Sequence, residues 1–254
     1  MQTTRTDLLR KVPQVGLLFW IIKLCTTAMG ESTSDFLVFH YNPYAAVIAG
    51  FVIFIVSMWL QFRTTKYIPW VYWLNVLMVA IFGTMAADVT HVVLGVPYSI
   101  SSLAFAVALA IIFYLWRKSE GTLSIHSITT RRRESFYWAT VLATFALGTA
   151  AGDLFAFTLH LGFLSAGIVF ASIFAISALG YAMFKWNAVF SFWLAYILTR
   201  PIGASFADWT GKGRAAGGLG WGDGPVATVL FVLILLFVGY LQITHEDVDS
   251  GPTN

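Results

Sequence analysis

The segment FWIIKLCTTAMGESTSD, from Phe19 to Asp35, has three counterparts further along the chain. They are YWLNVLMVAIFGTMAAD at 72–88, YWATVLATFALGTAAGD at 137–153 and FWLAYILTRPIGASFAD at 192–208. All four align without a gap on an aromatic residue, Trp, nine residues, Gly, four residues and Asp. Four copies in register form an internal repeat, which indicates a fold built from four similar units. The motif residues are Trp20, Trp73, Trp138 and Trp193, then Gly30, Gly83, Gly148 and Gly203, then Asp35, Asp88, Asp153 and Asp208.

The composition is typical of an integral membrane protein. Of the 254 residues, 58% are hydrophobic and 11% are charged, whereas a soluble domain carries about 25% charged residues. Eight apolar segments are long enough to cross ~30 Å of hydrocarbon as helices, and the ten-residue alternation of a membrane barrel is absent. We therefore predict an all-α polytopic protein with eight transmembrane helices. The segments are approximately 15–39, 44–62, 68–94, 100–116, 136–159, 163–184, 189–208 and 226–243.

Lys and Arg residues gather in alternate loops, and this asymmetry predicts the orientation. The first three connections on one side, near Asn42, Gly95 and Gly162, contain no basic residue. Only the last loop on that side carries any, Lys212 and Arg214. The positive-inside rule then predicts that the N-terminus lies in the cytoplasm, and an even number of spans returns the C-terminus to the same side.

With this orientation, the motif falls on the first, third, fifth and seventh spans, which would all run in one direction. The pattern predicts four parallel two-helix repeats around an axis along the membrane normal rather than inverted repeats. We expect a single membrane domain over 1–254, with a cytoplasmic basic loop at 118–134 and an outer Gly-rich loop at 209–225. The expected repeats are approximately 12–66, 67–118, 134–186 and 187–245.

The Trp and Gly residues of the motif have a structural interpretation. Trp at the start of each motif helix is a common interfacial anchor, and the aromatic residue before it also suits packing between repeats. Gly at the tenth position of each motif allows close approach of helices, as small residues generally do in membranes. We therefore assign the four Trp and four Gly residues to repeat packing.

The acidic residues are the candidate functional groups. Five of the twelve fall within the motif segments, namely Asp35, Asp88, Asp153, Asp208 and Glu31. A carboxylate inside a span is costly, so it normally faces a wet cavity or a partner. Hard oxygen ligands suit a divalent cation such as Mn²⁺ or Mg²⁺, or protons. The alternative is that the Asp residues are helix caps and hydrogen-bond acceptors between repeats.

Only two basic residues, Lys23 and Arg200, lie inside the expected spans. The stripe of Trp20, Lys23, Thr27, Glu31 and Asp35 follows helical spacing and makes one face. Equivalent faces on the other motif helices would line a common interior if they converge. An always-charged guanidinium in a span needs a carboxylate, so we expect Arg200 to pair with Asp208, Glu31 or an Asp of a neighbouring motif helix. We assign Lys23 and Arg200 to ion pairing and gating.

The chain also resembles a known family. Its opening KVPQVGLLFWIIKLCTTAMGESTSDF, the segment RPIGASFADW and the Gly-rich loop that follows are similar to a family of bacterial membrane proteins known only as a repeat of unknown function. The resemblance covers nearly the whole chain. It implies a multi-pass protein of the bacterial inner membrane, but it implies no activity and no binding residues.

Two functional hypotheses follow. The first is a transporter or channel-like carrier for a small cation, a divalent metal or protons, through a carboxylate-lined cavity. The second is a non-transporting scaffold or partner subunit with structural acids. We do not expect an enzyme, because no nucleophile–base pair or metal-ligand motif recurs. Expected partners are membrane lipids and the cation, with no nucleic acid and no cofactor beyond a bound divalent cation, and the oligomeric state stays open.

Overall fold

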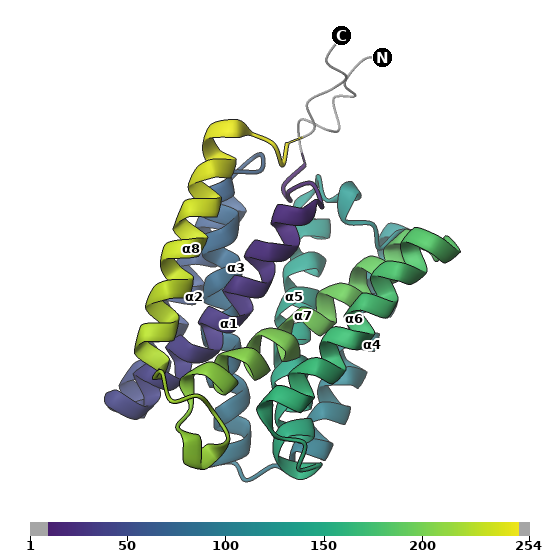
Figure 1. Ribbon diagram of the computed structural model, residues 1–254. Coiled ribbons are helices and arrows are strands. Elements are labelled where there is room, and N and C mark those ends of the chain that lie inside the picture. Colours follow the sequence, from purple (N-terminus) through teal and green to yellow (C-terminus); the bar gives the residue numbers. More distant parts are fainter. Residues whose placement is uncertain (1–9, 249–254) are drawn as a thin grey trace, which may run out of the picture.

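The computed structural model describes residues 10–248 of the chain, and these form eight α-helices with short loops (Figure 1). Two of the helices continue into a π-helical turn, η2 after α3 and η4 after α5. The α-helices are α1 (Leu17–His40), α2 (Pro43–Arg63), α3 (Pro69–Asp88), α4 (Tyr98–Glu120), α5 (Arg131–Asp153), α6 (Gly162–Phe184), α7 (Ala188–Gly211) and α8 (Asp223–Thr244). The π turns are η2 (Val89–Val93) and η4 (Leu154–Thr158).

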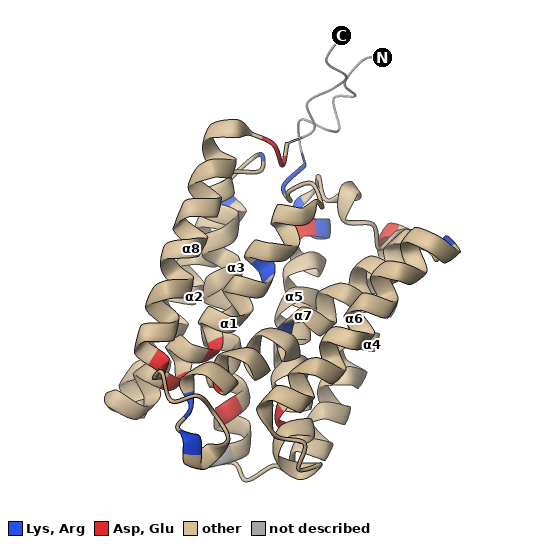
Figure 2. Ribbon diagram, viewed as in Figure 1, with Lys and Arg blue, Asp and Glu red and all other residues tan. Residues whose placement is uncertain are grey.

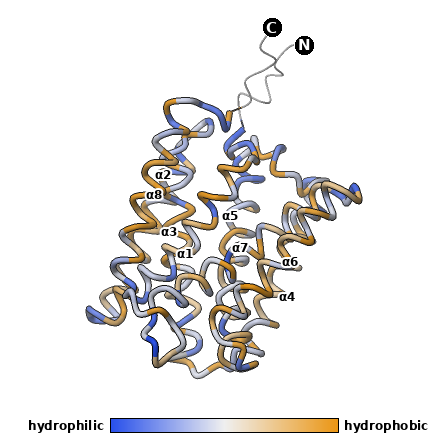
Figure 3. The backbone as a smooth tube through the Cα atoms, viewed as in Figure 1, coloured by the Kyte–Doolittle hydropathy of each residue, from blue (hydrophilic) through white to orange (hydrophobic). Residues whose placement is uncertain are grey.

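The prediction of an all-α membrane protein built from four two-helix repeats is confirmed. Within residues 10–248, seven of the eight helices are long and apolar enough to cross a membrane. The exception is α1, whose 24 residues are sufficient in length but include Lys23, Glu31 and Asp35. Hydrophobic residues dominate the middle of the bundle, and hydrophilic ones gather towards its two ends (Figure 3).

The four motif helices form an inner ring. α1 packs on α3, α3 on α5, α5 on α7, and α7 returns to α1. Each outer helix covers the motif helix of the following repeat, so that α2 packs on α3, α4 on α5, α6 on α7, and α8 closes the circle on α1. The apolar stretches of α3, α5 and α7 are accordingly 50–72% buried, against 22–28% for the outer helices. The outer helices therefore present the surface that faces lipid.

Aromatic side chains close the ring at one level. In every repeat, the aromatic residue that precedes the motif Trp packs against the Trp of a neighbouring repeat, at ring-centroid separations typical of aromatic pairs. The contact runs round the whole ring, which explains why the aromatic–Trp pair recurs in all four copies. The pairs are Phe19–Trp73 at 5.6 Å, Tyr72–Trp138 at 5.6 Å, Tyr137–Trp193 at 6.2 Å and Phe192–Trp20 at 5.8 Å.

The motif glycines close the ring at a second level. Each Gly faces the residue three positions before the Gly of the next motif helix, in the pairs Gly30–Ala80, Gly83–Phe145, Gly148–Arg200 and Gly203–Thr27. A Cβ atom on Gly30 would lie 2.5 Å from the Cβ of Ala80, and one on Gly148 would lie 2.6 Å from the Cβ of Arg200. The motif Gly therefore sets the closest approach between consecutive motif helices, as small residues do in membranes.

The starts of the motif helices meet at one end of the bundle, which we call the terminal end. The amide of Tyr67 donates to Arg10, that of Lys11 to Ile128 and that of Gln14 to Asp247, at 2.8–3.1 Å. The four motif helices consequently run in the same direction, and both described ends of the chain lie together (Figure 1). The opposite end holds the four motif Asp residues, and we call it the carboxylate end.

A buried ion pair fastens the terminal end. The ammonium of Lys11 lies 2.5 Å from Glu134, whose other oxygen accepts from Gln61 at 3.0 Å. Glu134 is fully buried, although it falls within the basic loop predicted for 118–134.

Two predicted loops are shorter than expected. The basic loop of 118–134 is reduced to 121–130, because α4 continues to Glu120 and α5 starts at Arg131, where the side chain of Thr130 caps the helix. The Gly-rich loop of 209–225 is reduced to 212–222. Charged and small residues do not end a helix once its apolar part is anchored. The helices therefore extend beyond the apolar runs from which their ends were predicted.

Candidate functional site

The inward faces of the four motif helices build the ring interior in layers. Residues at equal distance from the motif Trp come to one level, and every one of them is at most 6% exposed. The layers are Lys23, Val76, Val141 and Tyr196, then Thr27, Ala80, Phe145 and Arg200, then Glu31, Thr84, Thr149 and Ala204. The predicted helical stripes therefore do line a common interior.

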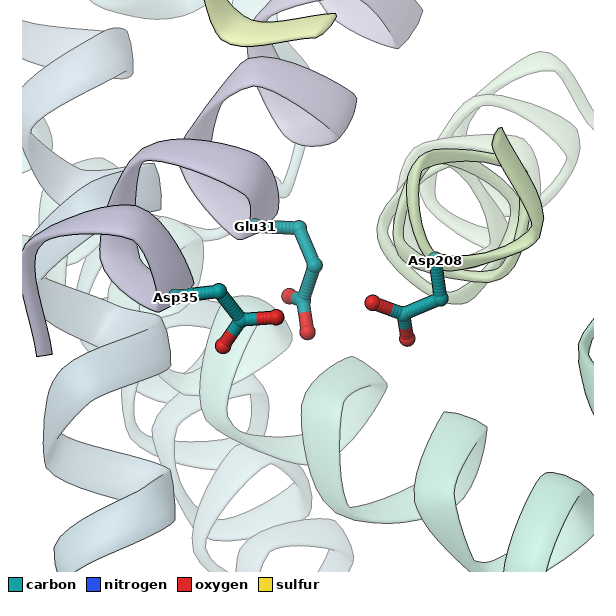
Figure 4. Close-up of side chains that lie close together, drawn as sticks. All are labelled: Glu31, Asp35 and Asp208. Carbon is teal, nitrogen blue, oxygen red and sulfur yellow. The ribbon is translucent and has the colours of Figure 1, made fainter. Parts of the chain in front are cut away.

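Three carboxylates converge at the carboxylate end. Glu31, Asp35 and Asp208 each offer an oxygen atom, and these atoms lie within 4.8 Å of one another. The three side chains point from α1 and α7 into the same space (Figure 4). Glu31 and Asp208 are each 6% exposed, and Asp35 is partly buried. We refer to these residues as the carboxylate triad.

Local sequence and helix packing both create the triad. Glu31 and Asp35 are four residues apart, so they lie on one face of α1, one turn from each other. Asp208 comes from α7, which Gly203 brings against Thr27 and the backbone of Ala28. Only the close approach of these two helices allows a carboxylate of α7 to reach those of α1.

Arg200 balances one charge of the triad. Its Nη2 donates to a carboxylate oxygen of Glu31 and, at 2.7 Å, to the hydroxyl of Thr84. The guanidinium is 1% exposed, and its Nε and Nη1 have no hydrogen-bond partner within residues 10–248. Arg200 therefore has one of the carboxylate partners expected for it, and the pair links α7 to α1.

Lys212 balances a second charge, and sequence reasoning missed it. Its ammonium donates to Asp35, lies 3.4 Å from Asp223 and lies 4.0 Å from Asp208. Burial opposes its charge, but the carboxylates of Asp35 and Asp208 outweigh this and raise the pKa of Lys212 above its usual value. The signal in the sequence was the spacing of four residues between Asp208 and Lys212 at a helix end.

The Gly-rich loop holds Lys212 and Asp223 in place. Residues 219–222 run back along the end of α7, where the amides of Leu219, Gly220 and Trp221 donate to Trp209, Lys212 and Thr210 at 2.7–3.1 Å. Gly217, Gly220 and Gly222 have φ values of +81° to +87°, which glycine adopts without strain. The glycines therefore fold the loop onto the carboxylate end.

The charges at the carboxylate end do not balance. Its four carboxylates are Glu31, Asp35, Asp208 and Asp223, and its two basic groups are Arg200 and Lys212, so two negative charges are left over if all are ionised.

Three of the five expected acids form the triad, and the charges of Glu31 and Asp35 also act on the other two, Asp88 and Asp153. Asp88 and Asp153 lie outside the triad, and within residues 10–248 neither side chain forms an ion pair or hydrogen bond. α3 and α5 change to π turns directly after these two residues, whereas α1 and α7 continue as α-helices beyond Asp35 and Asp208. The four repeats therefore differ in pairs at this end, and π turns of this kind are frequent at functional sites.

Within residues 10–248 Lys23 forms no ion pair, contrary to expectation. Its ammonium is 1% exposed and lies 4.1 Å and 4.3 Å from the ring centroids of Phe145 and Tyr196. No hydrogen-bond partner for it occurs among residues 10–248. Glu31 is two turns further along the same helix and is paired with Arg200, so Lys23 is held by aromatic rings instead.

Comparison with known proteins gives one match. Segments 18–67, 71–122, 136–185 and 191–246 each match the model of a repeat described as "Repeat of Unknown Function (DUF347)". Every segment covers one motif helix and the outer helix that follows it. No curated protein and no solved structure matches the chain.

Proposed function

Since the chain belongs to the family described as Repeat of Unknown Function (DUF347), whose description assigns no activity, we propose from the geometry that it is a membrane carrier for a small cation. The cation binds at the carboxylate triad of Glu31, Asp35 and Asp208. Mg²⁺ and Mn²⁺ are the preferred substrates, because carboxylates are hard oxygen ligands. The resemblance of the sequence to bacterial proteins favours the inner membrane of a bacterium, and we propose no enzymatic reaction.

The observation that carries this proposal is the convergence of three carboxylates within 4.8 Å inside a membrane bundle. Like charges at this separation repel strongly unless a cation lies between them. Intramembrane carboxylates mark ion pathways for the same reason. The triad and Asp223, together with Arg200 and Lys212, carry two excess negative charges if all are ionised, and one divalent ion would neutralise them.

Lys212 supports the same interpretation as an internal substitute for the cation. Its ammonium contacts Asp35 and lies within 4.0 Å of Asp208. It also sits on a loop at the end of the bundle rather than on a buried helix face. An entering cation would take over these contacts as Lys212 leaves them.

A structural role for the acids is the second candidate, and one observation favours it. Glu31 and Asp35 already have basic partners within the chain, Arg200 and Lys212. In a non-transporting scaffold, these two pairs would simply join α1 to α7 and to the Gly-rich loop. The two candidates differ in whether a cation binds and crosses.

Purified protein in proteoliposomes separates them. Uptake of Mn²⁺ is measured with an internal metal-sensitive dye, for the wild type and for Asp35→Asn and Asp208→Asn. Glu246→Gln is the control, because Glu246 is an exposed carboxylate beyond the end of α8, at the terminal end of the bundle and away from the triad. We expect the triad variants to lose uptake on the order of 100-fold, since each removes a charged ligand, and the control to keep it. If well-folded wild-type protein takes up none of Mn²⁺, Mg²⁺ and Ca²⁺, the carrier hypothesis is rejected and the scaffold hypothesis is supported.

A further inference from the structure

Ionisable and hydrogen-bonding side chains continue along the ring beyond the triad, towards the terminal end. Basic residues lie within the bundle between its two ends (Figure 2). Arg200, Thr84 and Glu31 form one connected group, and Lys23 lies two turns before Glu31 on α1, about 12 Å along the helix axis. The outer faces of the bundle are apolar at this depth, so the polar groups follow the ring interior.

Tyrosine hydroxyls extend the polar interior from Lys23 to the terminal end. Tyr196 packs its ring against the Lys23 ammonium, and it lies one helical turn from Arg200 on α7. Tyr72 and Tyr137 are both 1% exposed and share a hydrogen bond between their hydroxyls. At the terminal end itself, the hydroxyl of Tyr67 donates to Asp247.

Lys23 is the central group of this series. It is a buried amine without a carboxylate partner within residues 10–248, so it can gain or lose a proton without breaking an ion pair. Arg200 cannot do the same, because a guanidinium stays protonated in proteins and this one is bonded to Glu31. Buried lysines act as general bases in other proteins.

The helices around α1 contribute different groups to the surroundings of Lys23. α2 carries its ionisable residues, Tyr44 and Arg63, at its two ends. α7 supplies Tyr196 and the repelling charge of Arg200. α3 and α5 supply Tyr72 and Tyr137, one layer closer to the terminal end. α8 has Asp223 at the carboxylate end and an exposed Tyr240, so it adds no charge at this level. Glu31, on α1 itself, is the nearest carboxylate along the helix.

We propose that the ring interior conducts protons and that Lys23 is the residue that binds and releases them. The lone pair of the neutral amine forms an N–H bond with an arriving proton, and the same bond breaks on release, leaving the electron pair on nitrogen. The tyrosine hydroxyls lie on the terminal side of Lys23, and the pair of Arg200 and Glu31 lies on its other side. The inference rests on the proposed function, because it names protons as the coupling ion of the cation carrier.

Proton movement is measured in proteoliposomes with an internal pH dye, under a potassium diffusion potential, with and without external Mn²⁺. Lys23→Met removes the amine, and Lys23→Arg keeps a positive charge that is never released. Lys118→Met is the control, since Lys118 is an exposed lysine at the end of α4. We expect both Lys23 variants to lose proton flux on the order of 100-fold, with the control unchanged. Stabilisation of both Lys23 variants by Mn²⁺ should persist, because the triad is intact.

The outcomes separate the two proposals. Proton flux that survives in Lys23→Arg, or in a folded Lys23→Met, overturns the role of Lys23. Mn²⁺ uptake in the wild type without any proton movement overturns the proton path but leaves the carrier. Proton flux that depends on Lys23, without uptake of any cation, supports the proton path and removes the metal carrier. If Lys23→Met fails to insert, the arginine variant decides the question alone, because it conserves the charge.

Discussion

The guanidinium of Arg200 donates to the carboxylate of Glu31 across 169 positions of sequence, and this pair joins the last motif helix to the first inside the ring. The same donor nitrogen holds the hydroxyl of Thr84 on α3. Three of the four inner helices are thus connected at one buried point, through a carboxylate that belongs to the triad. The pair both closes the ring and fixes the position of a candidate ligand.

Replacing Arg200 should destabilise the protein more than replacing both partners. Arg200→Met leaves the Glu31 carboxylate buried without its counter-ion, which costs about 3–5 kcal/mol. Arg200→Met with Glu31→Gln removes that charge and should recover a large part of the loss. Thermal unfolding of the detergent-solubilised protein measures the difference, and equal stabilities of the single and double variants would contradict the pairing.

The motif glycines should not tolerate a methyl group. In Gly30→Ala the new Cβ meets the Cβ of Ala80 at 2.5 Å and its backbone carbonyl carbon at 2.9 Å, so α1 and α3 must separate, at a cost of about 1–3 kcal/mol. Gly16→Ala is the control, because nothing lies within 4 Å of a Cβ there. Unfolding temperatures of the two variants should differ clearly. Similar values would show that the glycine contacts are loose.

Removing Lys212 should strengthen metal binding. Lys212→Met frees Asp35, Asp208 and Asp223 from their internal cation, so Mn²⁺ should stabilise the variant at roughly tenfold lower concentration than the wild type. Arg214→Met, in the same loop but exposed, is the control. Thermal shifts over a metal titration provide the measurement. An unchanged or weaker response would mean that Lys212 does not compete with the cation.

The contact between Tyr67 and Asp247 should make the terminal end sensitive to pH. Burial raises the pKa of Asp247 above the ordinary value of 3.8, although the hydrogen bond from Tyr67 opposes this. The folded state then holds the proton more strongly than the unfolded state, so stability should fall as the pH rises from about the ordinary value through the raised one. Asp247→Asn should remove this part of the pH dependence. An identical profile in the variant would exclude Asp247 as its source.

The orientation in the membrane is still a prediction. Basic loops and the hydrogen bond between Gln14 and Asp247 place both described chain ends on one side of the bundle. Reporter fusions after Thr122 and after Asn254 should therefore both report cytoplasm. A signal from the opposite side at either position would contradict the N-in, C-in arrangement.

Much of the fold followed from the sequence because helical spacing is a local property. A rise of 1.5 Å and a turn of 100° per residue place Lys23, Thr27, Glu31 and Asp35 on one face whatever surrounds the helix. Four copies of one motif in register then predicted four repeats with equivalent inner faces. Even the carboxylate partner of Arg200 was limited to a few candidates by the scarcity of charge inside the spans.

Only the tertiary structure decided which of those faces meet. Identical motif positions did not make Asp88 and Asp153 equivalent to Asp35 and Asp208, because α3 and α5 pass into π turns where α1 and α7 continue. Lys212 reached Asp35 through a loop fold built on glycine conformations and long-range backbone hydrogen bonds. Spacing along a helix is set by covalent geometry, whereas contacts between helices depend on how their surfaces pack, and residues 169 or 177 positions apart meet only through that packing.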